Sequence, residues 1–372
     1  MTKSGTILAL FPFSARGNLA LAILREMRRR DLSVTVAYCV EAKHHIPDPA
    51  EDFARDNCFL DFTKLPIGQE LDFVEEEIRK RGVRLILQIG ASPMYRRLPF
   101  IKEKYPEIMI VDLLYNDRGH VVQHFLFEPA IDGVIVESEY MQRYVQRCSA
   151  KPDPQVHVIR SGVDLETFTP AFRTSEHAGL ILGYVGRMSE EKNPLGFVAL
   201  AEQLHANFPD AVFPISGEGP LATDVRERIE ASPARGAFRW HGYDQDILGL
   251  LRRLDALVVP SLVDGRPIVI MEANACGVPV IAAPVGGIPE MIEVGVNGYL
   301  FPPAAAEPIL EILMLWRNDP QSLATIKASS RSFAERAFDK KDMLSAYERV
   351  FKEFLGLVGS NSEVGMQEDA AF

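Results

Sequence analysis

Two carboxylates stand eight positions apart in the segment 260–281, which reads PSLVDGRPIVIMEANACGVPVI. Asp264 follows a strand expected to end at Pro260, and Glu272 lies about two turns into a helix expected to end at Gly277. Both side chains are therefore expected to line one site. A carboxylate only accepts hydrogen bonds, so the pair suits a hydroxyl-rich ligand such as a sugar. Either acid alone would fit a helix-terminal charge or a solvated side chain.

Two cations flank a short loop in the segment 186–194, which reads GRMSEEKNP. Arg187 and Lys192 follow an expected strand and precede a helix that starts near Pro194, a favoured first helical position. Cations beside a helix N-terminus are suited to a diphosphate. The alternative is a surface ion pair between Lys192 and the glutamates that precede it.

Two glycine pairs mark turns. Gly217 and Gly219 lack the third glycine of a dinucleotide fingerprint, so they argue little for NAD. Gly286 and Gly287 precede the start of a helical turn, where backbone amides could face an anion, although a plain turn fits nearly as well.

Strand-like and helix-like segments alternate along the chain. Strands are expected at 6–11, 33–38, 85–88, 108–112, 133–137, 180–185, 211–216, 238–241, 256–260 and 278–282. Helices are expected at 18–30, 72–81, 193–207, 219–231, 245–254, 266–275 and 340–354. This rhythm predicts an α/β fold with two doubly wound parallel sheets, whose ligands lie at the carboxyl ends of the strands. The expected domains are 1–165 and 166–338, followed by a returning helix at 339–356 and a disordered tail at 357–372.

Composition narrows the class of protein. The 372 residues are 47% hydrophobic and 24% charged with a net charge of −11, which excludes a disordered chain and disfavours a nucleic-acid binder. No apolar run is long enough to span a membrane, and the N-terminus reads as a strand and not as a signal peptide. The four cysteines have no CxxC spacing, so reduced, buried thiols in the cytoplasm are expected.

Five linked motifs resemble those of family four of the retaining GT-B glycosyltransferases, in the family's order. They are Gly186–Asn193, Gly217–Pro220, Pro260–Ala282, Gly286–Glu290 and Asn297–Pro302, and Arg160–Pro170 resembles the family's inter-domain segment. The resemblance is close over about 155–305. It implies the GT-B fold, with two Rossmann-like domains facing a cleft.

The resemblance also implies roles for individual residues. Arg187 and Lys192 would hold the nucleotide diphosphate, Glu272 the ribose hydroxyls and Asp264 the transferred sugar. The family normally has Glu where Asp264 stands, and this departure bears on which sugar is used. The remaining donor-binding candidates in this half are Gly186, Gly217, Gly265, Arg266, Pro267 and Ile268.

The first half resembles the family only loosely. Gly17, with Arg16 beside it, stands where the family has a glycine-rich loop after the first strand. The family often has a histidine near the reacting carbon, and the candidates here are His120 and the strand-end Asp112. Ser138 reads as a helix N-cap.

Two further sequence features bear on metal binding and on membrane contact. Asp244 and Asp246 have the spacing of a metal-binding pair, but capping of the following helix explains them more simply, so we expect no metal and no cofactor. Arginines near the end of 19–30 and the basic, aromatic segment 95–104 could contact an anionic membrane, although cations at a helix C-terminus are the usual explanation.

The sequence therefore predicts a retaining, metal-independent glycosyltransferase. It would move a sugar from a UDP- or GDP-type donor to a hydroxyl of a glycan or lipid-linked acceptor, as in surface-polysaccharide biosynthesis. The expected location is the cytoplasm, with the inner face of the cell membrane as a further expectation. Two alternatives stay open: a sugar-nucleotide epimerase of the same fold and a non-catalytic nucleotide-sugar-binding subunit.

Overall fold

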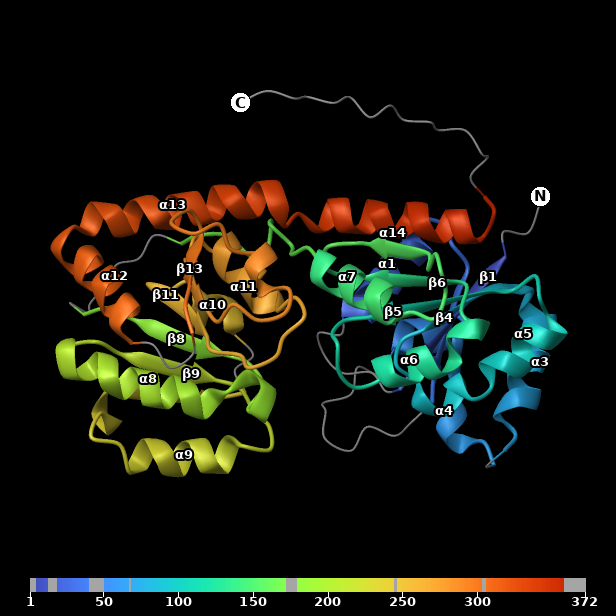
Figure 1. Ribbon diagram of the computed structural model, residues 1–372, viewed down its shortest axis with the longest axis horizontal. Helices are drawn as coiled ribbons and strands as arrows, with labels where there is room; N and C mark the ends of the chain where they lie inside the picture. Colours follow the sequence, from blue (N-terminus) through green and yellow to red (C-terminus); the bar gives the residue numbers. More distant parts are fainter. Residues whose placement is uncertain are drawn as a thin grey trace, which may run out of the picture. The chain divides into compact units, whose positions relative to one another are not determined.

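A computed structural model describes residues 5–12, 19–39, 50–66, 68–171, 179–243, 246–302 and 306–357. The protein is an α/β protein with two parallel sheets, as predicted (Figure 1). Because alternating strand and helix segments favour parallel pairing through helical crossovers, each sheet carries helices between its strands.

The first sheet has seven strands in the order β3-β2-β1-β4-β5-β6-β7. Its strands are β1 (Thr6–Phe11), β2 (Val34–Tyr38), β3 (Phe59–Asp61), β4 (Val83–Gln88), β5 (Met109–Leu114), β6 (Gly133–Val136) and β7 (Val156–Val158). The α-helices in this part are α1 (Leu19–Arg29), α2 (Glu51–Arg55), α3 (Glu70–Arg81), α4 (Ser92–Tyr95), α5 (Leu98–Lys104), α6 (Val121–Phe127) and α7 (Glu139–Cys148). The interior strand β1 is buried along its whole length, as its largely apolar sequence predicts.

The second sheet has six strands in the order β10-β9-β8-β11-β12-β13. Its strands are β8 (Leu182–Val185), β9 (Phe213–Ser216), β10 (Phe238–Gly242), β11 (Ala256–Val259), β12 (Val280–Ala282) and β13 (Gly298–Leu300). The α-helices in this part are α8 (Pro194–Asn207), α9 (Ala222–Glu230), α10 (Ile247–Leu251), α11 (Ile268–Ala275), α12 (Glu307–Asn318) and α13 (Pro320–Ala337). The last helix of the chain is α14 (Lys340–Phe354).

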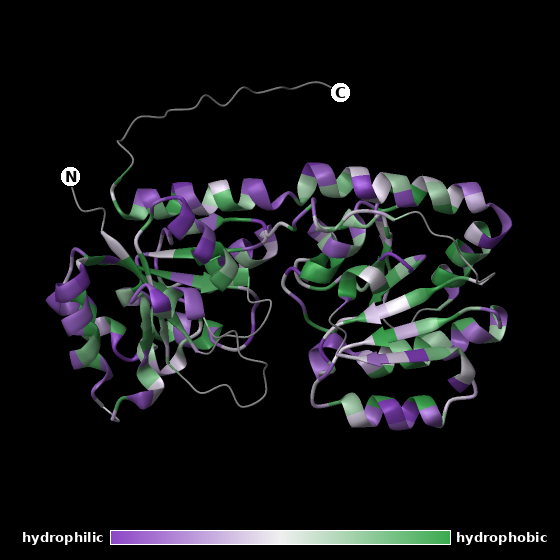
Figure 2. Ribbon diagram, turned by 180° about the vertical axis from the view of Figure 1, so that it is seen from behind, coloured by the Kyte–Doolittle hydropathy of each residue, from purple (hydrophilic) through white to green (hydrophobic). Residues whose placement is uncertain are grey.

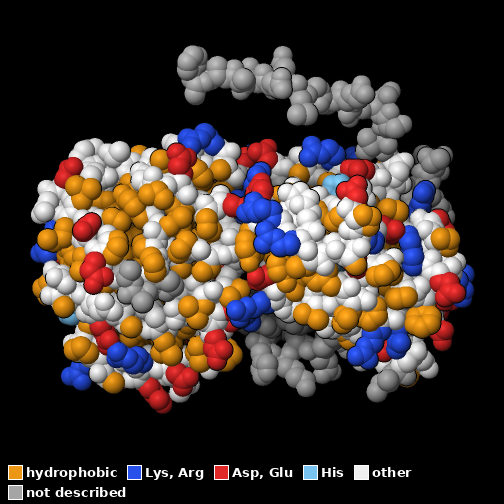
Figure 3. Space-filling view, in the orientation of Figure 1, with side chains coloured by type: hydrophobic (Ala, Val, Ile, Leu, Met, Phe, Trp, Pro, Cys, Tyr) orange, Lys and Arg blue, Asp and Glu red, His pale blue; other side chains and the backbone are white. Residues whose placement is uncertain are grey.

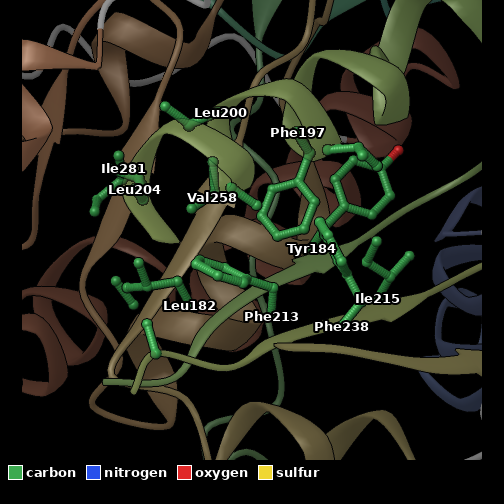
Figure 4. Close-up of a cluster of buried hydrophobic side chains, with 14 of the residues drawn as sticks. Leu182, Tyr184, Phe197, Leu200, Leu204, Phe213, Ile215, Phe238, Val258 and Ile281 are labelled. Atoms are coloured by element: carbon green, nitrogen blue, oxygen red, sulfur yellow. The ribbon is translucent and has the colours of Figure 1, made fainter. Parts of the chain in front are cut away.

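Successive residues of a strand point to opposite faces, and this rule divides the second sheet's core in two. Val258 and Ile281 join a cluster with Phe197 of α8 and Phe213 of β9, shown in Figure 4. The neighbouring residues of β11 and β12 instead join a cluster with α10, α11 and α13. Both faces are therefore covered, which makes the sheet doubly wound. Figure 2 shows the strands as largely hydrophobic and the helices as mixed.

The chain forms two compact units. One takes in the described residues of Met1–Asp112, Leu126–Gly133 and Leu344–Phe372, and the other those of Leu113–Phe125 and Val134–Met343. We call them the first and the second unit. Helix α14 from Leu344 onward belongs to the first unit, where Glu348 pairs with Arg30 next to α1 at 2.8 Å.

A buried pair of asparagines fixes the turn that precedes β13 to helix α11 in the second unit. Asn297 Nδ2 donates to Asn274 Oδ1 (2.7 Å) and to the Met291 carbonyl (2.8 Å), and Asn297 Oδ1 accepts from the Glu293 amide (2.7 Å). Both side chains are fully buried. Each bond therefore satisfies a group that has no access to water.

We expect Asn297→Ala to lower the free energy of unfolding by about 3–5 kcal/mol, because it leaves buried polar groups unsatisfied. Denaturant unfolding measures the effect. Asn207→Ala, at an exposed helix end, is the control and should change stability by less than about 0.5 kcal/mol. Equal effects of the two changes would contradict the importance of the buried pair.

Candidate functional site

The loop after β8 is joined to the loop after β11 by backbone and side-chain bonds. Asn193 lies in the left-handed region (φ 52°), caps α8 by accepting from the Gly196 amide (3.1 Å) and donates through Nδ2 to the Pro260 carbonyl (3.0 Å). The Leu262 amide donates to the Glu191 carbonyl (2.8 Å). The two segments singled out in the sequence thus meet at the carboxyl edge of one sheet, where parallel α/β sheets bind ligands.

Lys192 and Asp264 form the centre of this arrangement. Lys192 Nζ donates to Asp264 Oδ2 at 2.6 Å, and Ser261 Oγ donates to the same oxygen at 3.0 Å. The lysine side chain is 27% exposed and the aspartate side chain 7% exposed. A predicted phosphate-binding cation and a predicted sugar-binding acid therefore touch, and the lysine keeps a surface that a ligand can reach.

Arg187 lies on the same loop and is half exposed. It pairs with Glu191, whose carboxylate also accepts from Ser189 Oγ at 2.8 Å. The pair is at the surface, where such contacts are weak, so an incoming diphosphate can exchange with Glu191.

Glu272 lies in α11 and has no side-chain hydrogen bond or ion pair within the described part of the chain. Burial alone raises the pKa of this carboxyl from its ordinary value of 4.5 to about 7. An acid without a donor in a poorly solvated place is able to accept hydrogen bonds from hydroxyl groups of a ligand.

Glu272→Gln is expected to stabilise the protein at alkaline pH. Because the folded-state pKa is above the unfolded one, wild-type stability falls as pH rises from about 4.5 to about 7, and glutamine abolishes this loss. The gain should reach about 2–3 kcal/mol at pH 8 and vanish near pH 4.5. Thermal unfolding of both proteins at the two pH values measures it, and an equal difference at both would contradict the buried charge.

Gly217 allows the loop after β9 to touch the loop after β8. Its φ is +148°, and a Cβ at this position would lie 1.9 Å from the Gly186 carbonyl oxygen. Any side chain would therefore push the β9–α9 loop away from the loop that carries Arg187. Gly186 and Gly217, both predicted from the sequence to bind the donor, meet at this contact.

Arg266 is buried, unlike the other two cationic candidates, Arg187 and Lys192. It is 5% exposed, its guanidinium carbon lies 5.5 Å from the centre of the Phe338 ring, and its Nε and Nη1 atoms are buried without a hydrogen-bond partner in the described residues. Burial lowers the pKa of Arg266, and the charge of Glu137 acts in the opposite direction. Gly265 contacts the Tyr115 backbone closely, and Pro267 and Ile268 begin α11 beside it.

Glu137 was not among the site candidates predicted from the sequence, yet the charges of two candidates, Arg266 and Asp264, act on it. It follows β6 in the second unit, is buried, and accepts from Ser161 Oγ at 2.5 Å. Burial raises its pKa to about 7, the Ser161 bond and Arg266 oppose that rise, and Asp264 adds to it. Its place just after a buried strand was the available signal, but its nearness to Arg266 depends on the tertiary fold.

The two catalytic candidates of the first half are held by structural bonds. Asp112 has no exposed surface and accepts from Tyr95 Oη at 2.8 and 2.9 Å, so we do not include it in the proposed site. The His120 Nε2 atom is bonded to the carbonyl of Leu113 at 3.1 Å, which ties the ring to strand β5. Arg16 and Gly17 lie outside the described residues.

No cluster of side chains suited to a metal occurs among the residues that the structure describes. Asp246 caps α10 by accepting from the Gly249 amide at 2.8 Å, as predicted, while Asp244 lies outside the described residues.

The cysteines are free, but Cys148 is exposed, so the expectation that all four are buried was wrong. Basic and acidic side chains are interspersed on the face in Figure 3.

Comparison with known proteins now defines the class. The family model "Glycosyl transferases group 1" matches residues 169–333. The structure superposes on a glycosyltransferase from Rickettsia africae (TM-score 0.76, 18% identity, 96% of this chain and 99% of the other). It also superposes on Anabaena Alr3699/HepE in complex with UDP (TM-score 0.76, 18% identity, 94% and 100%). The fold is therefore GT-B, and residues 169–333 are similar to the group 1 glycosyl transferases.

Curated relatives match over part of their length. An Escherichia coli protein named UDP-Gal:alpha-D-GlcNAc-diphosphoundecaprenol alpha-1,3-galactosyltransferase is 34% identical over 40% of this chain and 42% of its own. A Mycobacterium D-inositol 3-phosphate glycosyltransferase is 31% identical over 45% and 41%. The chain thus spans less than half of the length of these two relatives.

Within the described residues, no helix is long and apolar enough to cross a membrane.

Proposed function

We propose that this protein is a retaining glycosyltransferase that transfers a sugar from a nucleotide-sugar donor to a hydroxyl group of a glycan or lipid-linked acceptor. The observation that carries the proposal is the Lys192–Asp264 contact at the carboxyl edge of the second sheet, among the residues that match the group 1 glycosyl transferase model. The superposed HepE structure contains UDP and the Escherichia coli relative is named for UDP-Gal, so a UDP-type donor is favoured over a GDP-type donor.

The leaving diphosphate gains negative charge as the anomeric bond breaks. In the proposed reaction Arg187 and Lys192 exchange their carboxylate partners for the diphosphate, and their bonds strengthen in the transition state. Because side-chain cations supply the positive charge, we propose that the reaction needs no metal.

Attack and departure would occur on one face of the sugar. The proposed site contains no side chain assigned as a nucleophile, so a front-face reaction is the proposed route to retention. Asp264 would accept hydrogen bonds from the sugar hydroxyls, and Glu272 from the ribose hydroxyls.

A panel of UDP-, GDP-, ADP- and dTDP-sugars tests the proposal. The cognate donor at about 100 times its Kd should stabilise the protein by about 2.7 kcal/mol, which a thermal-shift assay detects. Release of nucleoside diphosphate should then require an acceptor. Conversion of the donor without acceptor would instead indicate an epimerase, and binding without turnover with any acceptor would indicate a binding subunit.

Contact with an anionic membrane stays a prediction. The α1 arginines have partners within the first unit: Arg25 pairs with Asp52 at 3.0 Å, and Arg28 pairs with Asp56. Packing therefore accounts for part of this basic segment. Co-sedimentation with anionic vesicles at low salt would support membrane contact, and its absence would contradict it.

A further inference from the structure

The carboxylate of Glu290 caps helix α7 within the second unit. Its two oxygens accept from the backbone amides of Glu139 (2.9 Å) and Tyr140 (2.6 Å), and the next amide, that of Met141, donates to Ser138 Oγ at 3.2 Å. The first turn of α7 is thus satisfied partly by its own N-cap and partly by a residue 150 positions away. Negative charge at a helix N-terminus is favourable, and charge-assisted bonds are the strong ones.

Basic side chains support this arrangement of acids. Glu139 pairs with Arg160, and Arg143 of α7 lies 3.7 Å from the Glu290 carboxylate. The two glutamates lie side by side, and burial together with the neighbouring Glu139 raises the pKa of Glu290. Glu290 ends the short 3₁₀ helix Ile288–Glu290, so its attachment to α7 also fixes the turn that precedes it.

The turn that contains Gly286 and Gly287 packs closely against the backbone of Asp264 and Gly265. Gly286 has φ +56°, and a Cβ there would lie 1.8 Å from the Asp264 carbonyl oxygen. A Cβ on Gly287 would lie 2.3 Å from the Gly265 carbonyl oxygen. With so little space between the two backbones, a shift of the glycine turn moves the Asp264 loop as well.

We infer that Glu290 is a positioning residue for Asp264, acting through the glycine turn. Fixed to α7, it holds the turn against the Asp264 backbone, and the Asp264 carboxylate stays within 2.6 Å of Lys192. This role rests on the proposed function, because it matters for catalysis only if Asp264 holds the transferred sugar.

Glu290→Ala tests the inference, with Glu293→Ala as the control, since Glu293 is exposed and only three positions away. The Leu262 amide donates to the Glu191 carbonyl and is therefore protected from hydrogen exchange in the wild type. Glu290→Ala should raise exchange at 262–266 at least about tenfold, whereas Glu293→Ala should leave it unchanged.

Kinetics separates positioning from a general loss of structure. Glu290→Ala should lower kcat at least about tenfold and leave the affinity for free UDP within about twofold, because the diphosphate is held by Arg187 and Lys192. Glu290→Gln keeps an acceptor oxygen and should recover most of the activity, and it replaces the alanine variant if that one fails to fold.

The experiments distinguish a failure of the positioning role of Glu290 from a failure of the proposed glycosyltransferase function. Unchanged exchange at 262–266 in both Glu290 variants would overturn the positioning role. If the wild type transfers no sugar but the exchange difference is found, the positioning role stands and the proposed function falls. A parallel loss of UDP affinity and kcat would overturn the assignment to Asp264 in favour of a general loss of structure.

Discussion

Lys192→Ala is expected to lower kcat/KM for the nucleotide-sugar donor by about 10²–10³-fold, the usual loss when one preorganised donor to a developing negative charge is removed. Lys192 Nζ sits at the carboxyl edge of the second sheet, bonded to a single carboxylate and still partly exposed. A donor diphosphate offers this ammonium more negative charge than Asp264 does, and most of it in the transition state. Steady-state kinetics with the cognate donor measures the loss.

A second lysine of the chain provides a matched control. Lys327 donates to Asp255 at 2.7 Å, and the two side chains have the same exposures as the site pair, 27% and 7%. Lys327→Ala therefore removes a similar ion pair that lies outside the proposed site. Both variants should lose comparable stability, but only Lys192→Ala should lose activity at a temperature where both are folded. Equal losses of activity would show that ion-pair removal, and not phosphate binding, is responsible.

Most of the fold could be predicted because its strands are buried runs of apolar residues between helix signals. β1 was predicted at its observed bounds, and α14 likewise. The strands β3, β7 and β13 were missed. Each has three residues and lies at the edge of a sheet, where so short a segment shows no alternation and where pairing depends on one neighbour alone.

The site was predictable where a loop motif holds its own residues at the edge of a sheet. Lys192 and Asp264 are 72 positions apart, yet each follows a strand of the same sheet, and parallel strands bring such loops together. Strand-end position alone does not tell where a side chain points. Asp112 was predicted at a strand end, but β5 continues to Leu114, and the Asp112 carboxylate is bonded to Tyr95 inside the core.

Contacts between side chains that are far apart in the sequence could not be predicted from the sequence. Nothing in the residues around Glu290 indicates that its carboxylate caps a helix 150 positions earlier. The same holds for Glu137, whose Ser161 partner and Arg266 neighbour come from separate segments. These contacts are set by how the elements pack, which local patterns do not encode.

Asp264 is the residue whose replacement should separate sugar binding from diphosphate binding. Asp264→Asn is expected to lower kcat/KM for the nucleotide sugar by about 10–100-fold, because hydrogen bonds to a charged acceptor contribute about 1.5–3 kcal/mol. The affinity for free UDP should stay or increase, since Lys192 is released from its ion pair. Titration calorimetry with UDP and kinetics with the donor measure the two effects, and Asp255→Asn is the matched control at the Lys327 pair.

Glutamate, the residue that the resembled family normally has at this position, allows a sharper version of the experiment. Asp264→Glu keeps the charge and moves the carboxylate outward by about 1.5 Å, one carbon–carbon bond. If Asp264 contacts the sugar, this variant should change the ratio of kcat/KM between two UDP-sugars by at least about tenfold, because specificity depends on differential transition-state binding. UDP-glucose and UDP-galactose, which differ at one hydroxyl, are the pair to compare. An unchanged ratio, together with parallel losses of UDP affinity and turnover in Asp264→Asn, would show that the aspartate acts only by orienting Lys192.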